Sequence, residues 1–327
     1  MTQTRWAVLG PGAISRDFVV GLRASEHGVL HAVGSSSAER AGAFAAEHGA
    51  AASGTYDEIL ARDDVDAVYV GTVHTTHAEL AIRALEAGKA VLCEKPASPT
   101  LAEVELILQA AERAQRPFLE AFKTRFGPFA DALRELAAGE ELGPLDHVAG
   151  AFGFDAGTRQ GRLFDPALAG GAILDVGCYP VALAVDLAAA AGQPIGQPVY
   201  HGFDAEVVAG VDGWATAGIG FGAVAAEVAT SVVEDLSDLG LLHFADGDVL
   251  LPNVWGSRTE SPSTLIVRRG ADERVVELPV VQPMAAEADA LSLALTEGRL
   301  EVPQMPWSHT RAVARVLTDW RAAALAG

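Results

Sequence analysis

The sequence lacks three features, and each absence excludes a class of protein. It has only two cysteines in 327 residues, Cys93 and Cys178, which are too few for a disulfide framework and fit a reducing compartment. It is poor in positive charge: 23 lysines and arginines against 43 acidic residues give a net charge of −20, which repels nucleic acid and anionic membranes. It also lacks an apolar run of the roughly 20 residues that span a membrane, and the longest run, Val181 to Ala191, contains Asp186.

The remaining composition is that of a folded enzyme-sized chain. Half of the residues are hydrophobic, which suffices for a sizeable core, and the length predicts two domains. The segment Met1 to Trp6 has no apolar core of a signal peptide. We therefore expect a cytoplasmic protein without nucleic-acid or membrane partners, in which an anionic cofactor needs a local pocket that is positive or lined by amides.

The first predicted strand, Arg5 to Leu9, runs directly into a glycine turn. Gly10 permits the tight turn, and Gly12 lets the backbone approach a pyrophosphate. The helix that follows begins with Ala13 and Ile14, and its N-terminus supplies N–H groups and the positive end of a dipole. The third glycine of the G-x-G-x-x-G pattern is replaced by serine, so the motif is partial, but its place after the first strand predicts a dinucleotide site.

The second predicted strand, Val29 to Val33, ends in a run of hydroxyls. About 20 residues after such a glycine turn, NAD-specific sites carry an acid for the ribose 2′-hydroxyl. This sequence has no acid there; Ser35, Ser36 and Ser37 are followed by Arg40. Hydroxyls and a guanidinium suit a 2′-phosphate, which favours NADP with NAD as the alternative. The serines can also simply cap the next helix, and both roles are compatible.

The third predicted strand, Ala67 to Val70, is followed by Thr72, Val73, His74 and His77 at its carboxyl end. Two histidines without spaced cysteine or carboxylate partners make a poor zinc site. We expect cofactor or substrate contacts from this turn, and a structural hydrogen bond is the alternative for His77.

The apolar strand Ala90 to Cys93 ends in Glu94, Lys95 and Pro96. Proline cannot donate to a ladder, so the strand is expected to end at or before it. In open parallel α/β sheets, ligands bind outside the carboxyl ends of the strands. Lys95 is therefore predicted to lie at the mouth of a ligand crevice, with Glu94 beside the cofactor; the alternative is a surface ion pair.

The remaining pattern predicts an α/β fold with two domains. Residues 1–123 alternate strands and helices, which is the doubly wound parallel sheet of the Rossmann type. Residues 124–327 are predicted to form a substrate-binding and dimerisation domain of the α+β class with a large, open and mostly antiparallel sheet, and packing of the last helices back on the first domain is an open alternative. The predicted elements of the second part are strands 145–154, 199–208, 214–221, 224–234, 239–244, 265–269 and 274–278, and helices 129–138, 175–191, 284–297 and 307–325.

One segment of this second part carries polar residues on a helical repeat. Asp175 and Tyr179 are four residues apart, so both project from one face of the predicted helix. Gly170 and Gly171 precede it and allow a loop to approach a ligand closely. The alternatives are a helix cap for Asp175 and simple packing for Tyr179.

With these motifs in this order, the chain resembles the Gfo/Idh/MocA oxidoreductase family, to which glucose–fructose oxidoreductase and inositol dehydrogenase belong. The resemblance spans nearly the whole chain, and its Asp-x-Gly-x-Tyr-Pro form is similar to the dihydrodiol and D-xylose dehydrogenase branch. Val73 and Lys123 depart from the usual residues of the family. The segments that carry the resemblance are Gly10-Pro11-Gly12, Glu94-Lys95-Pro96, Glu120-Ala121-Phe122, Arg125-Phe126-Gly127-Pro128, Arg162-Leu163-Phe164-Asp165-Pro166, Asp175-Val176-Gly177-Cys178-Tyr179-Pro180 and Gln304-Met305-Pro306-Trp307.

The resemblance implies an NAD(P)-dependent oxidoreductase that transfers hydride between the nicotinamide and a secondary alcohol or carbonyl of a sugar, sugar derivative or diol. It implies Lys95, Asp175 and Tyr179 as catalytic and substrate-binding residues, and a homodimer or homotetramer. Tyr179 is the expected proton donor or acceptor, with Lys95 as the alternative base. Arg162 and Phe154, with Arg159 and Trp255, are weaker candidates for substrate contact.

Two other functions fit the same fold. One is an oxidoreductase that keeps its cofactor tightly bound and couples two sugars. The other is a nucleotide-binding regulator without catalysis, since fold alone does not decide function. A regulator can lose Lys95 or Tyr179, whereas this chain has both.

Overall fold

The computed structural model describes residues 3–139, 141–256 and 262–326. The chain forms two compact units. Unit 1 consists of Met1–Ser98, Ala102–Lys123 and Gln282–Trp307, and unit 2 of Pro99–Leu101, Thr124–Val281 and Ser308–Gly327. The main division falls after Lys123, where the sequence predicts a domain boundary. The helix that follows the second sheet belongs to unit 1.

Unit 1 is built on a parallel sheet with the strand order β3-β2-β1-β4-β5-β6. This order predicts a ligand site where the strand sequence reverses, at the carboxyl ends of β1 and β4. The strands are β1 (Thr4–Leu9), β2 (Gly28–Ser35), β3 (Ala52–Thr55), β4 (Ala67–Val70), β5 (Ala90–Glu94) and β6 (Phe118–Ala121). The α-helices are α1 (Ala13–Leu22), α2 (Ala38–His48), α3 (Tyr56–Leu60), α4 (His77–Glu86), α5 (Leu101–Ala114) and α8 (Pro283–Glu297).

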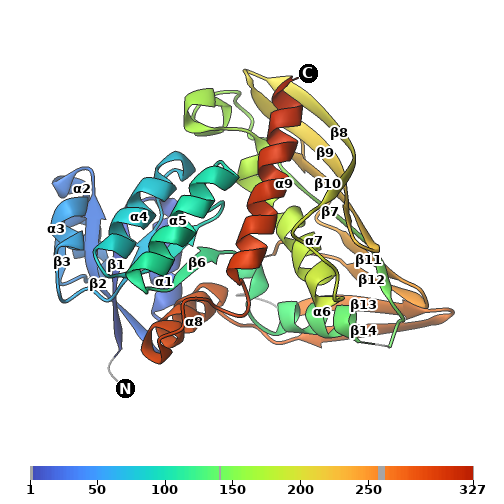
Figure 1. Ribbon diagram of the computed structural model, residues 1–327, viewed down its shortest axis with the longest axis horizontal. Helices are drawn as coiled ribbons and strands as arrows, with labels where there is room; N and C mark the ends of the chain where they lie inside the picture. Colours follow the sequence, from blue (N-terminus) through green and yellow to red (C-terminus); the bar gives the residue numbers. More distant parts are fainter. Residues whose placement is uncertain (1–2, 140, 257–261, 327) are drawn as a thin grey trace. The chain divides into compact units, whose positions relative to one another are not determined.

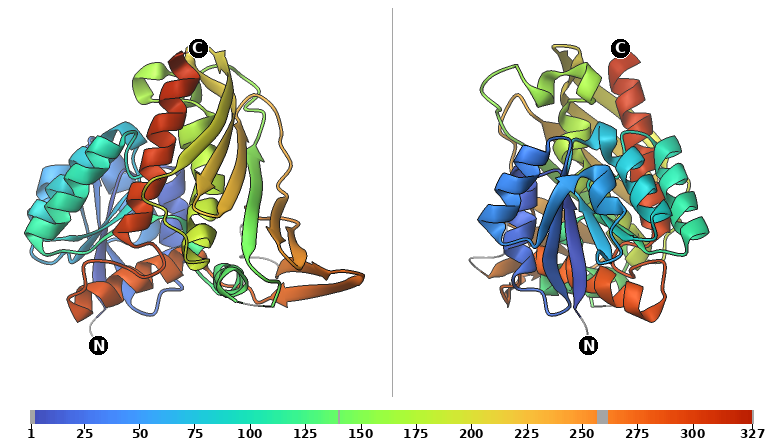
Figure 2. Two further views of the ribbon diagram at one scale, coloured as in Figure 1. Left: turned by 45° about the vertical axis from the view of Figure 1, so that its right-hand side comes forward. Right: turned by 90° about the vertical axis from the view of Figure 1, so that its left-hand side faces the viewer.

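The predicted doubly wound parallel sheet is confirmed, and one strand was missed. β3 reads Ala-Ser-Gly-Thr and lies at the sheet edge beside β2. A run with so few large apolar residues carries no strand signal of its own. It forms because β2 offers it unpaired backbone groups. Figures 1 and 2 show helices on both faces of this sheet. α4 packs on β4 and β5, and α8 packs on α1 and β5.

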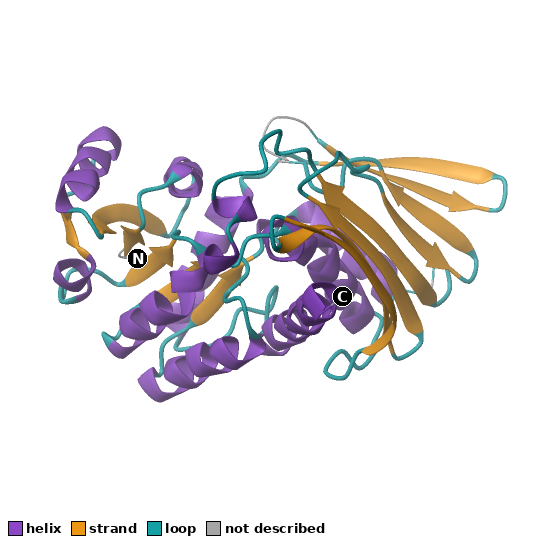
Figure 3. Cartoon of the chain, turned by 90° about the horizontal axis from the view of Figure 1, so that it is seen from above, coloured by secondary structure: helices purple, strands orange, loops and turns teal. Residues whose placement is uncertain are grey.

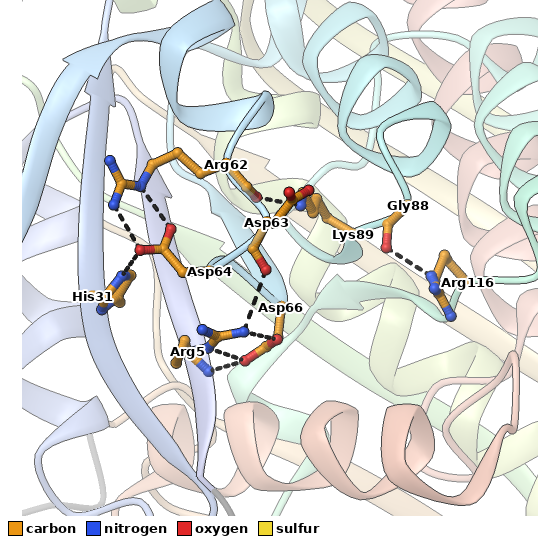
Figure 4. A network of polar contacts seen from close by, with 9 residues as sticks. All are labelled: Arg5, His31, Arg62, Asp63, Asp64, Asp66, Gly88, Lys89 and Arg116. Atoms are coloured by element: carbon orange, nitrogen blue, oxygen red, sulfur yellow. Dashed lines mark hydrogen bonds and ion pairs between the residues drawn. The ribbon is translucent and has the colours of Figure 1, made fainter.

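A network of polar contacts connects the loops at the N-terminal ends of the parallel strands, away from their carboxyl ends (Figure 4). Arg5 makes a two-pronged contact with Asp66, and Arg62 pairs with Asp64 at 2.6 Å. Lys89 donates to the carbonyl of Arg62 at 2.6 Å. Exposed ion pairs of this kind contribute little stability each. Their effect is to fix the loops at the edge that lies away from the predicted ligand site.

Unit 2 contains a sheet of eight strands with the order β14-β13-β12-β11-β7-β10-β9-β8. All neighbouring pairs are antiparallel except β7 and β10, which confirms the mostly antiparallel prediction. β12 was missed; its turn with β11 contains only Ala245 and Asp246. The strands are β7 (Leu145–Gly153), β8 (Val199–Val208), β9 (Val211–Phe221), β10 (Val224–Ser231), β11 (Gly240–Phe244), β12 (Gly247–Leu251), β13 (Ser263–Arg269) and β14 (Asp272–Leu278).

The helices of unit 2 gather on one face of this sheet, as Figure 3 shows. They are α6 (Pro128–Ala138), α7 (Cys178–Ala190) and α9 (Trp307–Ala326). α7 packs on β7, β10 and α6. The phenol of Tyr200 in β8 donates to Asp319 in α9 at 2.7 Å. Within the described residues, no α-helix packs on the opposite face, so the predicted open sheet is confirmed.

The segment Pro166–Ala190, which ends in α7, has 25 residues and would suffice to cross a membrane by length and composition, but 78% of its most apolar window is buried within the protein. Asp186, which interrupts the apolar run, lies 3.2 Å from Arg125 and 3.1 Å from Arg134. Its apolar character therefore follows from its place in the core.

Candidate active site

The glycine turn of unit 1 leaves room for a ligand beside the start of α1. Gly10 has a φ of +92°, and a Cβ there would lie 3.1 Å from the carbonyl oxygen of Gly71. Only glycine therefore fits this position. Gly12 is the N-cap of α1 and contributes no side-chain hydrogen bond. No side-chain cap therefore occupies the first amides of α1, which include those of Ala13 and Ile14, and they are available to an anion.

The serine that replaces the third glycine has a structural explanation. Ser15 is fully buried, and its hydroxyl donates to the carbonyl oxygen of Gly10 at 2.6 Å. This bond fixes the turn from inside. The backbone of Gly71 lies close against Ser15, and a Cβ at Gly71 would overlap the Ser15 hydroxyl. Close packing at this point therefore depends on Gly71 and not on a glycine at position 15.

The hydroxyl run lies at the carboxyl end of β2. The Arg40 guanidinium donates to the Ser36 hydroxyl at 2.8 Å. The Ser37 hydroxyl accepts from the Arg40 amide at 3.3 Å and caps α2, while Ser35 is buried. The two predicted roles therefore belong to different residues. Ser37 caps the helix α2, whereas the hydrogen-bonded pair of Ser36 and Arg40 is the candidate phosphate site. Tyr56 also lies near Arg40, whose charge acts to lower the tyrosine pKa against the larger effect of burial, which raises it. The sequence analysis did not include Tyr56 among the residues of this site.

The two histidines after β4 are those expected to contact cofactor or substrate. Both are buried. The ring nitrogens of His77 lie 2.9 Å from the carbonyl oxygen of Pro96 and 3.2 Å from that of Thr72, and burial lowers its pKa to about 4. A neutral imidazole has one N–H and donates to only one of these two carbonyl oxygens. The buried ring lies between the segments after β4 and β5, which fits the structural role that the sequence left open for it. Val73 and Thr72 keep partial exposure beside it.

Lys95 is the one residue between Lys89 and Ser98 that is not buried. It follows β5, which ends at Glu94, as predicted. The Lys95–Pro96 peptide is cis. Glu94 is buried; it accepts from the Tyr69 hydroxyl at 2.6 Å and from the Lys95 amide at 3.3 Å. Glu94 therefore supports the position of Lys95 from inside the unit.

Three acids are buried around this strand end. Glu120 accepts from the Ala97 amide at 2.8 Å. Glu287 of α8 is 2% exposed, and burial, with the charge of Glu94, raises its pKa well above its usual range. Burial also raises the pKa of Glu94, against the charge of Lys95. Sequence reasoning missed Glu287, because nothing in an amphipathic helix marks one glutamate as buried.

In unit 2, Asp175 and Tyr179 are the only residues from Gly170 to Pro180 that keep solvent access. The predicted continuous α-helix is wrong in one respect: Ile173–Gly177 forms a π-helix, and α7 begins at Cys178. Such π segments occur frequently at functional sites. The Asp175 carboxylate lies 2.9 Å from the Arg162 guanidinium, so the structure brings these two predicted site residues together.

An aromatic cluster surrounds the Tyr179 ring. Phe152 lies 5.5 Å from it and Trp255 6.0 Å, between ring centroids. Phe154 instead packs against a separate buried cluster around Phe164, and exposed Arg159 pairs with Asp155 at 2.6 Å. Phe152 was missed because two phenylalanines end the same strand and the sequence does not say which one faces the tyrosine.

The described residues include no group of three or more histidine, cysteine or acidic side chains that could hold a metal ion. Both cysteines are buried, and within the described residues neither forms a disulfide.

Comparison with known proteins identifies the family. Residues 4–122 match the model of an oxidoreductase family with an NAD-binding Rossmann fold, and residues 130–237 match the GFO/IDH/MocA C-terminal domain. Trans-1,2-dihydrobenzene-1,2-diol dehydrogenase of Homo sapiens is 33% identical over 98% of this chain and 96% of its own length. The chain belongs to the GFO/IDH/MocA oxidoreductase family.

Other relatives agree with this assignment. The Xenopus tropicalis protein of the same name is 28% identical over 97% of this chain and 96% of its own. D-xylose 1-dehydrogenase (NADP⁺) of Hypocrea jecorina is 33% identical over 54% of this chain and 51% of its own. The solved aldose-aldose oxidoreductase of Caulobacter crescentus has a TM-score of 0.88 at 24% identity, covering 98% of this chain and 97% of its own, and shares the fold.

Proposed function

We propose that the protein is an NADP-dependent oxidoreductase that transfers hydride between the nicotinamide and a secondary alcohol or carbonyl of a sugar, sugar derivative or diol. One observation carries the proposal: in two otherwise buried segments, the residues with solvent access are Lys95 in one and Asp175 and Tyr179 in the other. A phenol can accept the proton of an alcohol, and an ammonium can stabilise charge on the reacting oxygen, so these groups suit alcohol oxidation. The names of the relatives support the substrate class.

The residues of unit 1 fit the cofactor. The glycine cradle at Gly10 and Gly12 and the uncapped start of α1 suit a pyrophosphate. Ser36 and Arg40 suit the 2′-phosphate that distinguishes NADP from NAD, because a guanidinium binds phosphate in two-pronged fashion. When bound, NADP supplies the hydride acceptor or donor.

The chain's own residues would handle the proton and the charge. Tyr179 would take the proton of the substrate hydroxyl during oxidation and return it during reduction. Lys95 would stabilise negative charge on the reacting oxygen, and is the alternative proton acceptor. Asp175, oriented by Arg162 at 2.9 Å, would hold a neighbouring hydroxyl.

A substrate panel tests the proposal. Purified protein is mixed with NADP⁺ or NAD⁺ and with D-xylose, other aldoses, anhydrosugars and trans-1,2-dihydrobenzene-1,2-diol, and reduced cofactor is followed by absorbance. We expect turnover with at least one sugar or diol and a preference for NADP⁺. Binding of NADPH without turnover of any compound would contradict the enzyme function and favour a regulator.

We also propose that the chain assembles as a homodimer or homotetramer through the uncovered face of the sheet in unit 2. A hollow of about 870 Å³ lies on strands β7 to β12. Leu241, which lines this hollow, is 39% exposed, and exposed apolar side chains on such a face favour association. Light scattering after gel filtration tests this, and a monomer at micromolar concentration would contradict it.

A cytoplasmic location without nucleic-acid or membrane partners remains part of the proposal. The net charge of −20 supports it, since like charges repel. Fractionation of cells that express the protein tests it, with recovery in the membrane pellet as the contrary result.

A further inference from the structure

Asp212 is a buried carboxylate in unit 2 for which the proposed mechanism has no use. It is the second residue of β9, and its side chain has no exposed surface. Burial raises its pKa to about 6, against the hydrogen bond from the Ile173 amide. Burying a carboxylate costs free energy unless other groups compensate it, so its partners indicate what it does.

The main partner is the start of the π-helix that carries Asp175. The amide of Ile173, the first residue of that helix, donates to Asp212 Oδ2 at 2.6 Å. The first amides of a helix have no partner within the helix, and an acidic side chain satisfies them best. On the other side, Arg321 of α9 has its Nε atom 4.0 Å from Asp212 Oδ1.

Two glycines make this contact possible. Gly171 has a φ of +120°, and a Cβ there would lie 2.8 Å or less from both oxygens of Asp212. At Gly170, a Cβ would lie 2.7 Å or less from the carbonyl oxygens of Arg162 and Leu163. The absence of side chains therefore allows two close contacts. The backbone at Gly171 packs against the Asp212 carboxylate, and the backbone at Gly170 packs against the carbonyls of Arg162 and Leu163.

We propose that Asp212 is a positioning residue that fixes the start of the π-helix and thereby orients the Asp175 carboxylate and the Tyr179 hydroxyl. The inference rests on the roles proposed above for those two residues. A neighbouring bond supports the same segment: the Thr230 hydroxyl donates to the carbonyl oxygen of Ala172 at 3.2 Å. A π-helix is a rare arrangement that occurs frequently at functional sites.

Hydrogen exchange tests the inference without any substrate. Full-length wild type, Asp212→Ala, Asp212→Asn and the exposed-acid control Glu206→Ala are compared by mass spectrometry. In Asp212→Ala we expect amides 173–179 to exchange on the order of tenfold faster, with residues 4–35 of unit 1 unchanged. Asp212→Asn keeps an oxygen acceptor and should restore most of the protection, and Glu206→Ala should match wild type.

Kinetics supply the second readout, with D-xylose or trans-1,2-dihydrobenzene-1,2-diol, whichever the wild type oxidises faster. We expect Asp212→Ala to lower kcat by about tenfold or more, with an unchanged dissociation constant for NADPH and partial rescue by Asp212→Asn. If Asp212→Ala fails to fold, Gly171→Ala, which displaces the carboxylate, should show the same local loss of protection.

The outcomes separate the two proposals. Unchanged exchange at 173–179 in Asp212→Ala, or exchange in Asp212→Asn as fast as in Asp212→Ala, would overturn the role of Asp212 whatever the activity. If amides 173–179 exchange faster in Asp212→Ala but the wild type oxidises no compound of the panel, the structural role of Asp212 is supported and the proposed function is contradicted.

Discussion

The hydroxyl of Tyr69 donates a 2.6 Å hydrogen bond to Glu94, the buried residue directly before Lys95. The ring of Phe18 stacks on Tyr69 with 3.9 Å between centroids and an interplanar angle of 1°. Stacking on Phe18 thus positions the Tyr69 ring, and the hydrogen bond from Tyr69 positions the Glu94 carboxylate. Glu94 was predicted to lie beside the cofactor; its partners in the structure are a core tyrosine and the amide of Lys95.

Removal of the Tyr69 hydroxyl tests this support. Tyr69→Phe keeps the stacked ring and leaves a buried carboxylate with one hydrogen bond fewer. We expect the free energy of unfolding to fall by about 1–3 kcal/mol in urea titrations. Tyr56→Phe is the matched control, because Tyr56 is only half-buried. Equal stability of Tyr69→Phe and wild type would show that Glu94 gains nothing from the bond.

Glu287 gives a prediction with a definite dependence on pH. Its pKa is raised by burial in the folded protein, so its contribution to stability is complete below the unfolded pKa and is lost as pH rises through the folded pKa. Glu287→Gln removes this dependence. We expect the variant to be more stable than wild type near pH 8, on the order of 1 kcal/mol, with a smaller difference near pH 5.

Thermal unfolding followed by circular dichroism at both pH values measures this. Glu297→Gln, at the exposed end of the same helix, is the control. A Glu287→Gln protein that is less stable than wild type near pH 8 would show that the carboxylate has a compensating partner.

Arg40 is expected to decide between the two cofactors. Its guanidinium, held by Ser36, would lose a charge-assisted contact with the 2′-phosphate in Arg40→Ala. We expect NADPH binding to weaken by about 2 kcal/mol, or about thirtyfold, with NADH binding nearly unchanged. Fluorescence titration of both cofactors measures the ratio. Equal weakening of both would place Arg40 outside the 2′-phosphate site.

Arg162 is expected to act through Asp175. In Arg162→Ala the carboxylate loses a partner at 2.9 Å, and we expect KM for the substrate to rise by about tenfold, a binding loss of about 1.4 kcal/mol. Arg268→Ala is the matched control, since this exposed arginine of unit 2 pairs with Glu273 at 2.8 Å and belongs to no predicted site. Equal steady-state parameters for Arg162→Ala and wild type would remove Arg162 from the substrate site.

The features that the sequence predicted are those whose signals are local. The glycine turn and the end of β5 before Pro96 depend on a few neighbouring residues, and both were correct. The unpredicted features depend on distant partners. β3 needs the edge of β2, and the π-helix of Asp175 begins at an amide bound by Asp212, which is 39 residues further along the chain.

The same distinction applies to the site. Asp175 and Tyr179 were proposed because the predicted helical spacing places them on one face, whereas the burial of His77 between two carbonyls follows from the turns after two separate strands. The sequence proposed Phe154 as a substrate contact and did not single out Phe152, whose ring lies near that of Tyr179, for a similar reason. Phe152 and Phe154 are two residues apart, so strand alternation predicts that both side chains lie on the same face. Only the tertiary packing shows that Phe152 is the one near Tyr179.

The central claim is that Lys95 acts on the substrate and not merely on the fold. The most direct measurement is kcat of Lys95→Met with the best substrate of the panel, beside the dissociation constant of NADPH. A methionine keeps the length of the side chain and removes its charge. We expect kcat to fall by about 10²–10⁴-fold with NADPH still bound. Undiminished turnover with normal cofactor binding would contradict the account.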